Sequence, residues 1–405
     1  MLRDFFPTGY PRYERSKFAR DLENFAIWLN VAGYSRQRAR RHLFWLREAL
    51  ERLTNAEPQG VFTIPQLEVS FDGACRDVQG AICYRATRRA YQKFLSERGR
   101  LVTIPVDVPF AELRERYRQE CLQLRGLSHE TVKQHEWTIG DFLNRVLPDG
   151  RTLKSLLPTD IDRYLSLKSQ TVGRQRLQHV VSHLRAFLIF CRTSGQIQRR
   201  LDAIDTVRAR SDELPPKALA WPHVQALLRS IDRSSRSGWR DYAILHLMAH
   251  YGVRPSEIVS LRLNSIDWHR KTFKVDQCKT GSILVLPLTD QTISILQSYL
   301  QHGRPHSSHQ QFFLRARCPD GALSHYAIND IFEKRAKLGG LTTAGYSAYS
   351  LRHAFAMRLL NRGVGLKIIG DLLGHRDLDV TAQYLRLQFD VLRAVALPVP
   401  VQRRA

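Results

Sequence analysis

The sequence lacks the features of a secreted or membrane protein. Its six cysteines are scattered over 405 residues without a C-x-x-C pair, which argues against a disulfide framework or a zinc site in a chain of this length. No uninterrupted apolar run approaches the roughly 18 residues of a membrane-spanning helix. The first residues also lack the apolar segment of a secretory signal. These absences predict a cytoplasmic protein with reduced thiols and no membrane contact.

Acidic residues are scarce as well. The chain has 38 Asp and Glu against 62 Lys and Arg, a formal net charge of +24. Such an excess favours a polyanionic partner, and nucleic acid is the usual one. On charge alone, a generally basic soluble protein and a binder of acidic lipid remain alternatives. Apolar residues make up 43% of the chain, which supports folded cores rather than wholesale disorder.

The length suits two or three domains, and prolines mark two boundaries. Residues 102–109 contain two prolines and indicate an extended linker, and a second linker follows around residues 208–216. We therefore divide the chain into three domains, at residues 1–105, 106–212 and 213–405.

The first two domains show the pattern of a diverged tandem repeat. Gly-x-Ser at 33–35 recurs at 126–128, where Ser128 is placed to cap a helix, and Arg-Ala-Tyr at 89–91 recurs as Arg-Ala-Phe at 185–187. The offset stays between 93 and 96 residues. Amphipathic helices of similar length can imitate such a repeat, which is the alternative.

The third domain combines helices with two short strands. Residues 273–275 and 283–288 have strand patterns and are joined by a turn at 279–281. The predicted fold class is mainly α, with a small β-sheet in the last domain and tandem helical domains before it.

The last domain also contains residues suited to attack on a phosphodiester. The transition state of such an attack is stabilised by fixed cationic donors. Arginine can contact two phosphate oxygens at once, and a tyrosine can become the covalent attachment point. The residues, in chain order, are Arg254, Lys279, Tyr349, Arg352, His375 and Tyr384.

Each of these residues has an ordinary alternative. Lys279 could be a plain exposed turn lysine, and Tyr384 would normally pack in a core. Arg352 lies in an apolar helical run, where an unpaired guanidinium is expensive unless an anion is close. The adjacent His353 is predicted to be a buried hydrogen-bonding residue rather than a catalyst. No Cys or carboxylate lies at metal-ligand spacing from His353 or His375, so we expect no metal.

The flanking motifs resemble those of the tyrosine recombinase (phage integrase) family. The resemblance begins at residues 251–258, Y-G-V-R-P-S-E-I, where Glu257 is placed to orient Arg254 by a salt bridge. It continues through L-R-H at 351–353 and L-L-G-H at 372–375, with Tyr384 nine residues later. It covers roughly residues 110–390.

The resemblance implies transesterification without a cofactor, ATP or a metal. Tyr384 would attack the scissile phosphate to give a 3′-phosphotyrosyl bond, and Lys279 would protonate the 5′-hydroxyl leaving group. It also implies that residues 106–212 form a SAM-like core DNA-binding domain. Double-stranded DNA would be the partner, with a homo-oligomer on DNA, expected to be a tetramer, and with partner recombinases as a further option.

One position departs from the family pattern. The second arginine motif normally begins with histidine three residues before the arginine, and this chain has Tyr349 there. A phenol has an unperturbed pKa near ~10, against about 6.5 for imidazole, so it is a poor general base at neutral pH. It can still donate a hydrogen bond to the phosphate or to the oxygen of Tyr384.

Three functions therefore compete. The first is a site-specific recombinase, with service to a mobile element as one option, and a topoisomerase would share its chemistry. The second is a catalytically silent DNA-binding subunit, which the departure at Tyr349 makes conceivable. The third is a nucleic-acid-binding regulator in which the order of motifs is accidental.

The DNA grip is expected from residues 110–210. Residues 1–105 could bind a second DNA segment or another protomer, and the apolar tail at 392–401 could pack into a neighbour or fold back. The candidate phosphate contacts are Lys133, His135, Arg174, Arg176 and Arg185.

Overall fold

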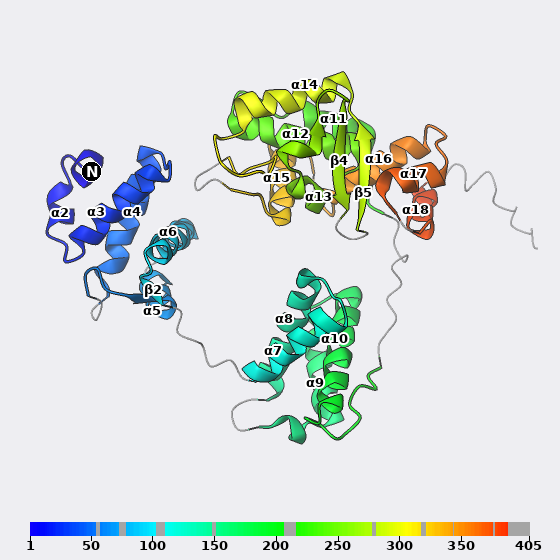
Figure 1. The fold of residues 1–405 in the computed structure, drawn as a ribbon, viewed down its shortest axis with the longest axis horizontal. Coiled ribbons are helices and arrows are strands. Elements are labelled where there is room, and N and C mark those ends of the chain that lie inside the picture. The colour runs from blue at the N-terminus through cyan, green and yellow to red at the C-terminus, as the bar shows by residue number, and fades with distance from the viewer. Residues whose placement is uncertain are drawn as a thin grey trace, which may run out of the picture. The chain divides into compact units, whose positions relative to one another are not determined.

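The chain is seen here in a computed structural model, which is mainly helical with two small sheets (Figure 1). We call residues 1–102 the N-terminal module, 110–205 the middle module and 216–387 the C-terminal module. The structure describes residues 1–53, 57–72, 78–102, 110–147, 151–205, 216–277, 281–316, 321–342, 344–375 and 377–387.

Each module contains a hydrophobic core of its own. By its contacts, Thr103–Leu214 separates as one compact unit from Met1–Val102 and Pro215–Ala405. The three-domain division of the sequence remains a prediction. Among the described residues, no helix has both the length and the apolar character needed to span a membrane.

The N-terminal module is a helical cluster closed by two short parallel strands, which pair Phe62 with Leu101. Helices α3, α4 and α6 pack on one another, and α5 packs on α6. The elements are α1 (Leu2–Phe5), α2 (Tyr10–Glu14), α3 (Ala19–Val31), α4 (Arg36–Leu50), β1 (Phe62–Thr63), α5 (Ile64–Asp72), α6 (Val78–Glu97) and β2 (Leu101–Val102).

The middle module is a second helical cluster in which α8 packs on α9 and α10. Ser128 caps α8 as predicted, because its hydroxyl accepts a hydrogen bond from the Thr131 backbone N–H at 3.2 Å. The elements are α7 (Ala111–Gln119), η1 (Glu120–Leu124), α8 (His129–Val146), η2 (Leu153–Ser155), α9 (Pro158–Ser169) and α10 (Arg174–Thr193).

The C-terminal module is built around helix α12, whose apolar residues are buried on nearly every side. Helices α11, α14, α15 and α16 pack against it. Its elements are α11 (Trp221–Arg229), α12 (Arg236–Tyr251), α13 (Pro255–Ser260), η3 (Leu263–Ser265), β3 (Ile266–Asp267), β4 (Thr272–Gln277), β5 (Ser282–Pro287), α14 (Asp290–Ser298), η4 (Tyr299–Gly303), α15 (His325–Leu338), α16 (Tyr349–Leu360), α17 (Leu366–Leu373), α18 (Asp379–Ala382) and η5 (Gln383–Leu387).

The sheet of the C-terminal module is antiparallel, in the order β3-β4-β5. Phe273 pairs with Leu286 and Val275 with Leu284, and the buried side chains of β4 alternate with exposed ones as expected for a sheet with one face on the core. Figure 1 shows α16, α17 and α18 (orange to red) grouped beside the β4–β5 hairpin. The predicted fold class, mainly α with a small sheet in the last domain, is confirmed.

Candidate active site

Arg254 is positioned by the sharp break between α12 and α13. Gly252 ends α12 in the left-handed conformation, with φ of 65°, and Arg254 is the N-cap of α13. Glu257, one turn later and 3% exposed, accepts a hydrogen bond from the Arg254 backbone N–H at 2.8 Å and forms an ion pair with its guanidinium. Glu257 therefore fixes the backbone and the side chain of Arg254 together, as the sequence predicted.

Arg352 is one of the largest fully buried side chains, with 1% exposure. Its guanidinium donates to the carbonyl oxygens of Gly252 and Leu373, the latter at 2.6 Å. Its Nε is buried without a hydrogen-bond partner in the described part of the chain. Burial lowers the pKa of this guanidinium. A buried cation held by carbonyls rather than by a carboxylate is costly unless an anion joins it.

His375 lies on the turn that ends α17. It follows Gly374, whose φ is 63°, and its Nε2 is 3.2 Å from Arg352 Nη2 while its Nδ1 is 2.8 Å from Thr381 Oγ1. Burial, followed by the positive charges of Arg352 and Arg254, lowers the pKa of His375 to about 4. The imidazole is therefore neutral near pH 7, with Nε2 accepting from Arg352 and Nδ1–H donating to Thr381.

Lys279, the predicted proton donor, lies outside the described residues. The last described residue before it, Gln277, ends β4 and is 3% exposed. A Cβ added at Gly374 would lie 1.8 Å from Gln277 Nε2. The hairpin strand that leads to Lys279 therefore ends directly against the turn that carries His375.

Tyr384 lies in η5 and is buried, with 1% exposure. It packs in a small core with Phe355 and Ile369, and its hydroxyl is 3.0 Å from His353 Nδ1. Burial raises the pKa of Tyr384, and the charge of Arg352 opposes this rise. Burial, and then Arg352, lowers the pKa of His353 to about 4. A neutral His353 can therefore accept the phenolic hydrogen.

Tyr349, the departure from the family pattern, is the first residue of α16 and is 38% exposed. Its ring lies edge-on to His353, with 4.9 Å between ring centroids. One turn of α16 thus brings Tyr349, Arg352 and His353 together, and His353 carries the contact to Tyr384.

His353 is the residue whose importance the sequence did not reveal. Its hydrogen bonding was predicted, but not its partner. The sequence placed it next to Arg352 and one helical turn after Tyr349, while Tyr384 is 31 residues away along the chain. Only the return of η5 onto α16 brings the two side chains together.

The structure corrects the prediction that His135 contacts phosphate. His135 is 6% exposed, its Nδ1 is 2.9 Å from the Tyr117 hydroxyl, and its ring contacts that of His183 in a tilted arrangement with 4.0 Å between centroids. Burial lowers the pKa of His135 to about 4, so it carries no charge near pH 7. It is a residue of the module's interior.

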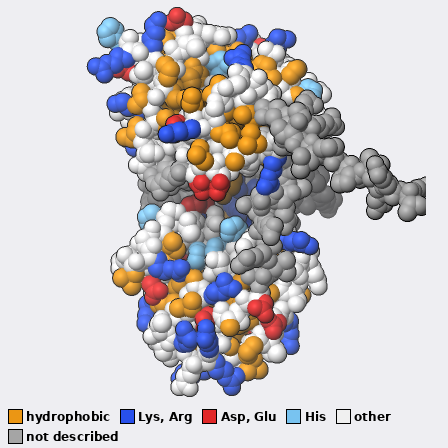
Figure 2. All heavy atoms as spheres, turned by 90° about the vertical axis from the view of Figure 1, so that its right-hand side faces the viewer, with side chains coloured by type: hydrophobic (Ala, Val, Ile, Leu, Met, Phe, Trp, Pro, Cys, Tyr) orange, Lys and Arg blue, Asp and Glu red, His pale blue; other side chains and the backbone are white. Residues whose placement is uncertain are grey.

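The other four candidates lie at or near the surface of the middle module. Lys133, Arg174 and Arg176 are exposed, whereas Arg185 is half-buried and donates to the Ile204 carbonyl at 2.7 Å. Arg176 also lies 5.4 Å from the ring centre of Trp137, which is 54% exposed. Figure 2 shows Lys and Arg side chains over the face of this module, in the lower half of the view.

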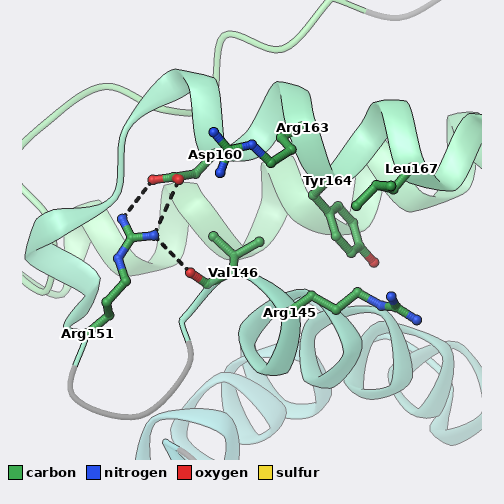
Figure 3. Close-up of a pocket in the computed structure, with 7 residues that line it drawn as sticks. All are labelled: Arg145, Val146, Arg151, Asp160, Arg163, Tyr164 and Leu167. Carbon is green, nitrogen blue, oxygen red and sulfur yellow. Dashed lines mark hydrogen bonds and ion pairs between the residues drawn. The ribbon is translucent and has the colours of Figure 1, made fainter.

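A shallow pocket between α8 and α9 adds to this basic surface (Figure 3). Inside it, Arg151 binds both carboxylate oxygens of Asp160 and the carbonyl of Val146. Arg145, which pairs with Asp141 at 3.0 Å, and the exposed Arg163 lie at its edges. The lining residues are Arg145, Val146, Arg151, Asp160, Arg163, Tyr164 and Leu167.

Comparison with known proteins identifies the fold and the family. The fold matches a solved DNA-bound recombinase, XerH on a palindromic difH substrate, with a TM-score of 0.55 at 17% identity over 69% of this chain and 83% of that chain. In sequence, residues 218–390 match the model of the Phage integrase family.

Two relatives come from Sinorhizobium fredii. The chain is 32% identical over 287 residues to the putative integrase/recombinase y4rA, an alignment that covers 70% of each protein. It is 38% identical over 187 residues to the putative integrase/recombinase y4gC, which covers 46% of this chain and 96% of the relative. The chain belongs to the phage integrase family, the tyrosine recombinases, whose general activity is site-specific DNA recombination.

Proposed function

We propose that this protein is a site-specific recombinase that cuts and rejoins duplex DNA through Tyr384. The observation that carries the proposal is Arg352. Its guanidinium is fully buried, is held by two carbonyls and an imidazole, and leaves Nε without a partner in the described part of the chain. A phosphodiester oxygen would supply the negative charge that this site lacks.

In the proposed reaction, Arg254 and Arg352 hold the non-bridging oxygens of the scissile phosphate. The Tyr384 oxygen attacks phosphorus, the bond from phosphorus to the 5′-oxygen breaks, and Lys279 protonates the leaving 5′-oxygen to give a 5′-hydroxyl. The product is a 3′-phosphotyrosyl bond. Attack by a 5′-hydroxyl on that bond reverses the step, so each phosphodiester is exchanged for another and no nucleotide needs to be hydrolysed.

The proton of Tyr384 needs an acceptor, and we assign this role to His353. Its Nδ1 already lies 3.0 Å from the phenolic oxygen, which is within hydrogen-bonding reach of the proton to be moved. Tyr349 lies in the position that the family gives to histidine, and it can donate a hydrogen bond from the edge of the same cluster. The bound phosphate would offset the charge of Arg352 that holds the pKa of His353 down.

Assembly and biological role belong to the same proposal. We infer that protomers assemble on two DNA sites, as a tetramer, and that the apolar tail at 392–401, which lies outside the described residues, joins neighbouring protomers. The relatives carry integrase and recombinase names, which supports service to a mobile element.

The test is formation of a covalent adduct. The full-length protein is incubated with labelled duplex from the ends of its encoding locus, nicked beside the cleavage point, and an SDS-resistant protein–DNA adduct is measured. We expect an adduct with the wild-type protein and none with Tyr384→Phe, which should still bind the duplex. Firm binding without any wild-type adduct would instead favour a silent DNA-binding subunit, a role consistent with the 1% exposure of Tyr384.

A further inference from the structure

The N-terminal module repeats the middle module helix by helix. Helices α3, α4, α5 and α6 correspond in order to α7 with η1, α8, α9 and α10. The connecting turns also correspond. Gly33 and Gly126, before the second helix, have φ of 76° and 60°, and Gly99 and Gly195, after the fourth, have φ of 65° and 73°.

The cores of the two modules contain the same aromatic arrangement. In each, one ring on the first helix contacts two rings on the fourth. The centroid distances are 5.3 and 5.4 Å in the N-terminal module and 5.3 and 5.2 Å in the middle module. The two triads are Phe25–Tyr91–Phe94 and Tyr117–Phe187–Phe190.

An imidazole occupies the same place between the second and fourth helices of both modules. His42 Nδ1 is 2.9 Å from Thr87 Oγ1, and the His135 ring contacts the His183 ring with 4.0 Å between centroids. His42 and His135 are 93 residues apart, and Thr87 and His183 are 96 residues apart. Both offsets match the repeat in the sequence. Helix order, glycine turns and core contacts therefore indicate two copies of one module.

The outer surface of α4 also corresponds to that of α8. Arg40 occupies the place of Lys133, and Phe44, 43% exposed, occupies the place of Trp137, 54% exposed. The N-terminal copy is the more basic one, because α4 contains five arginines and a single acidic residue, Glu48.

Four of these arginines are exposed, and we call them the arginine row of α4: Arg36, Arg38, Arg40 and Arg41. Two of them also have contacts within the module, because Arg36 donates to the Asp4 carbonyl oxygen and Arg40 lies over the Phe6 ring. Arg38 and Arg41 have no ion-pair partner among the residues that the structure describes. Their charges add to burial in lowering the pKa of His42 to about 4. Like charges at i,i+3 and i,i+4 repel each other on a helix, so a polyanion bound to these arginines would relieve that repulsion.

We propose that the N-terminal module is a second DNA-gripping module, which binds duplex DNA through phosphate contacts from the arginine row of α4. The proposal rests on the proposed function, in which the middle module holds DNA. A second copy of this chain is the weaker occupant, because a protein surface would have to supply a cluster of carboxylates to match these arginines, and this chain has only 38 acidic residues against 62 basic ones. The bound segment is a stretch of duplex beyond the one held at the active site.

The experiment measures the salt dependence of DNA binding by the full-length protein. Fluorescence anisotropy follows its affinity for a long duplex from the encoding locus across a salt series. The test variant is Arg38→Gln/Arg41→Gln. The matched control is Arg12→Gln/Arg15→Gln, which removes the same charge from exposed positions around α2 of the same module.

Each lost phosphate contact reduces the slope of log K against log salt by about 0.9. We therefore expect the α4 variant to lose about 1.8 from the slope and the control to stay close to the wild-type value. The α4 variant should still form the Tyr384 adduct on a short nicked duplex that carries only the cleavage site.

Two results would overturn the proposal. One is that the two variants give equal slopes of log K against log salt. The other is that the α4 variant keeps the wild-type slope but changes its oligomeric state in sedimentation, which would indicate a protein-binding face. Because the adduct is scored separately, a wild-type protein that binds DNA but forms no adduct contradicts the proposed function and not this module's role.

Discussion

At the residue scale, the site is organised around two buried side chains, Arg352 and Tyr384. Arg352 has no acidic partner within hydrogen-bonding distance in the described chain, and Tyr384 is hydrogen-bonded to the histidine that follows that arginine. The buried guanidinium and the proposed nucleophile are therefore tied to one turn of α16. A phosphate bound by Arg352 would arrive beside the hydroxyl that must attack it.

Replacing His353 by Asn tests its role as proton acceptor. The Asn oxygen can take the position of Nδ1 and accept a hydrogen bond from Tyr384, but it cannot take the proton at neutral pH. We expect adduct formation to slow by about 10²–10⁴-fold, the usual range for general acid–base catalysis, with DNA binding unchanged. The rate of adduct formation on the nicked duplex measures this.

The pH profile separates this role from a structural one. The wild-type rate should fall as the pH approaches 4, where His353 gains its proton, and this acid limb should be altered in the Asn variant. Tyr349→Phe is the matched comparison on the same helix. A rate equal to wild type in Tyr349→Phe would exclude a chemical role for that phenol, and a rate equal to wild type in His353→Asn would contradict our assignment.

The sequence predicted the local relations in this site better than the distant ones. Arg254 and Glu257 lie three residues apart on one helix, so their pairing follows from spacing alone. The contact between His353 and Tyr384 depends on how η5 returns to α16, which no local pattern encodes. His135 was misassigned for a similar reason, because its ring faces His183 on another helix, and only tertiary structure sets that burial.

At the element scale, short breaks between helices place the charged groups. The sequence predicted the repeat from glycines at fixed offsets, and it predicted the β4–β5 hairpin from alternating apolar residues. The break at Gly252 does more than end α12. Its carbonyl accepts from Arg352, and its missing side chain leaves room for Phe355 and Leu373.

Gly252→Ala should therefore reduce stability and activity together. An added Cβ would lie 2.6 Å from Phe355 and 2.7 Å from Leu373. The left-handed conformation costs a non-glycine residue roughly 1–2 kcal/mol, and overpacking adds about 1–3 kcal/mol. Urea denaturation should show the summed loss in free energy of unfolding, and the adduct assay should show slower cleavage.

Gly363→Ala is the control for this substitution. Gly363 also has a left-handed backbone, with φ of 79°, but a Cβ there would have nothing within 4 Å. It should show the conformational cost alone and retain cleavage. Equal losses of stability and activity in the two variants would mean that the contacts around Gly252 do not matter.

At the scale of the whole molecule, the chain combines a large positive charge with buried neutral histidines in all three modules. Burial lowers the pKa of His246 to about 3, and it lowers the pKa of five others to about 4. These five are His42, His135, His183, His353 and His375. Protonation of these histidines at low pH should therefore destabilise every module, and not the candidate site alone.

We expect the free energy of unfolding to fall as the pH drops from about 6.5 towards 4. In this window the unfolded chain binds protons at these histidines while the folded chain does not, so stability rises with pH. Denaturant titrations at pH 7, 5.5 and 4.5 measure the trend. His246→Gln keeps a hydrogen-bonding group near Thr292 and removes one titrating group, so the slope of its stability against pH should be shallower. A wild-type stability that stayed flat over this range would contradict the expectation.

The burial of Tyr384 has a consequence for the cell that carries this protein. A recombinase whose nucleophile stood open would risk a strand break at each chance meeting with a chromosome. Here the Tyr384 side chain is buried with Phe355 and Ile369, and it lies in the short helix η5, Gln383–Leu387. The phenol of a lone protomer would thus be out of reach of DNA that it meets by chance. Cutting would then be a separate event from finding DNA, because it would need the phosphate to reach the phenol beside His353.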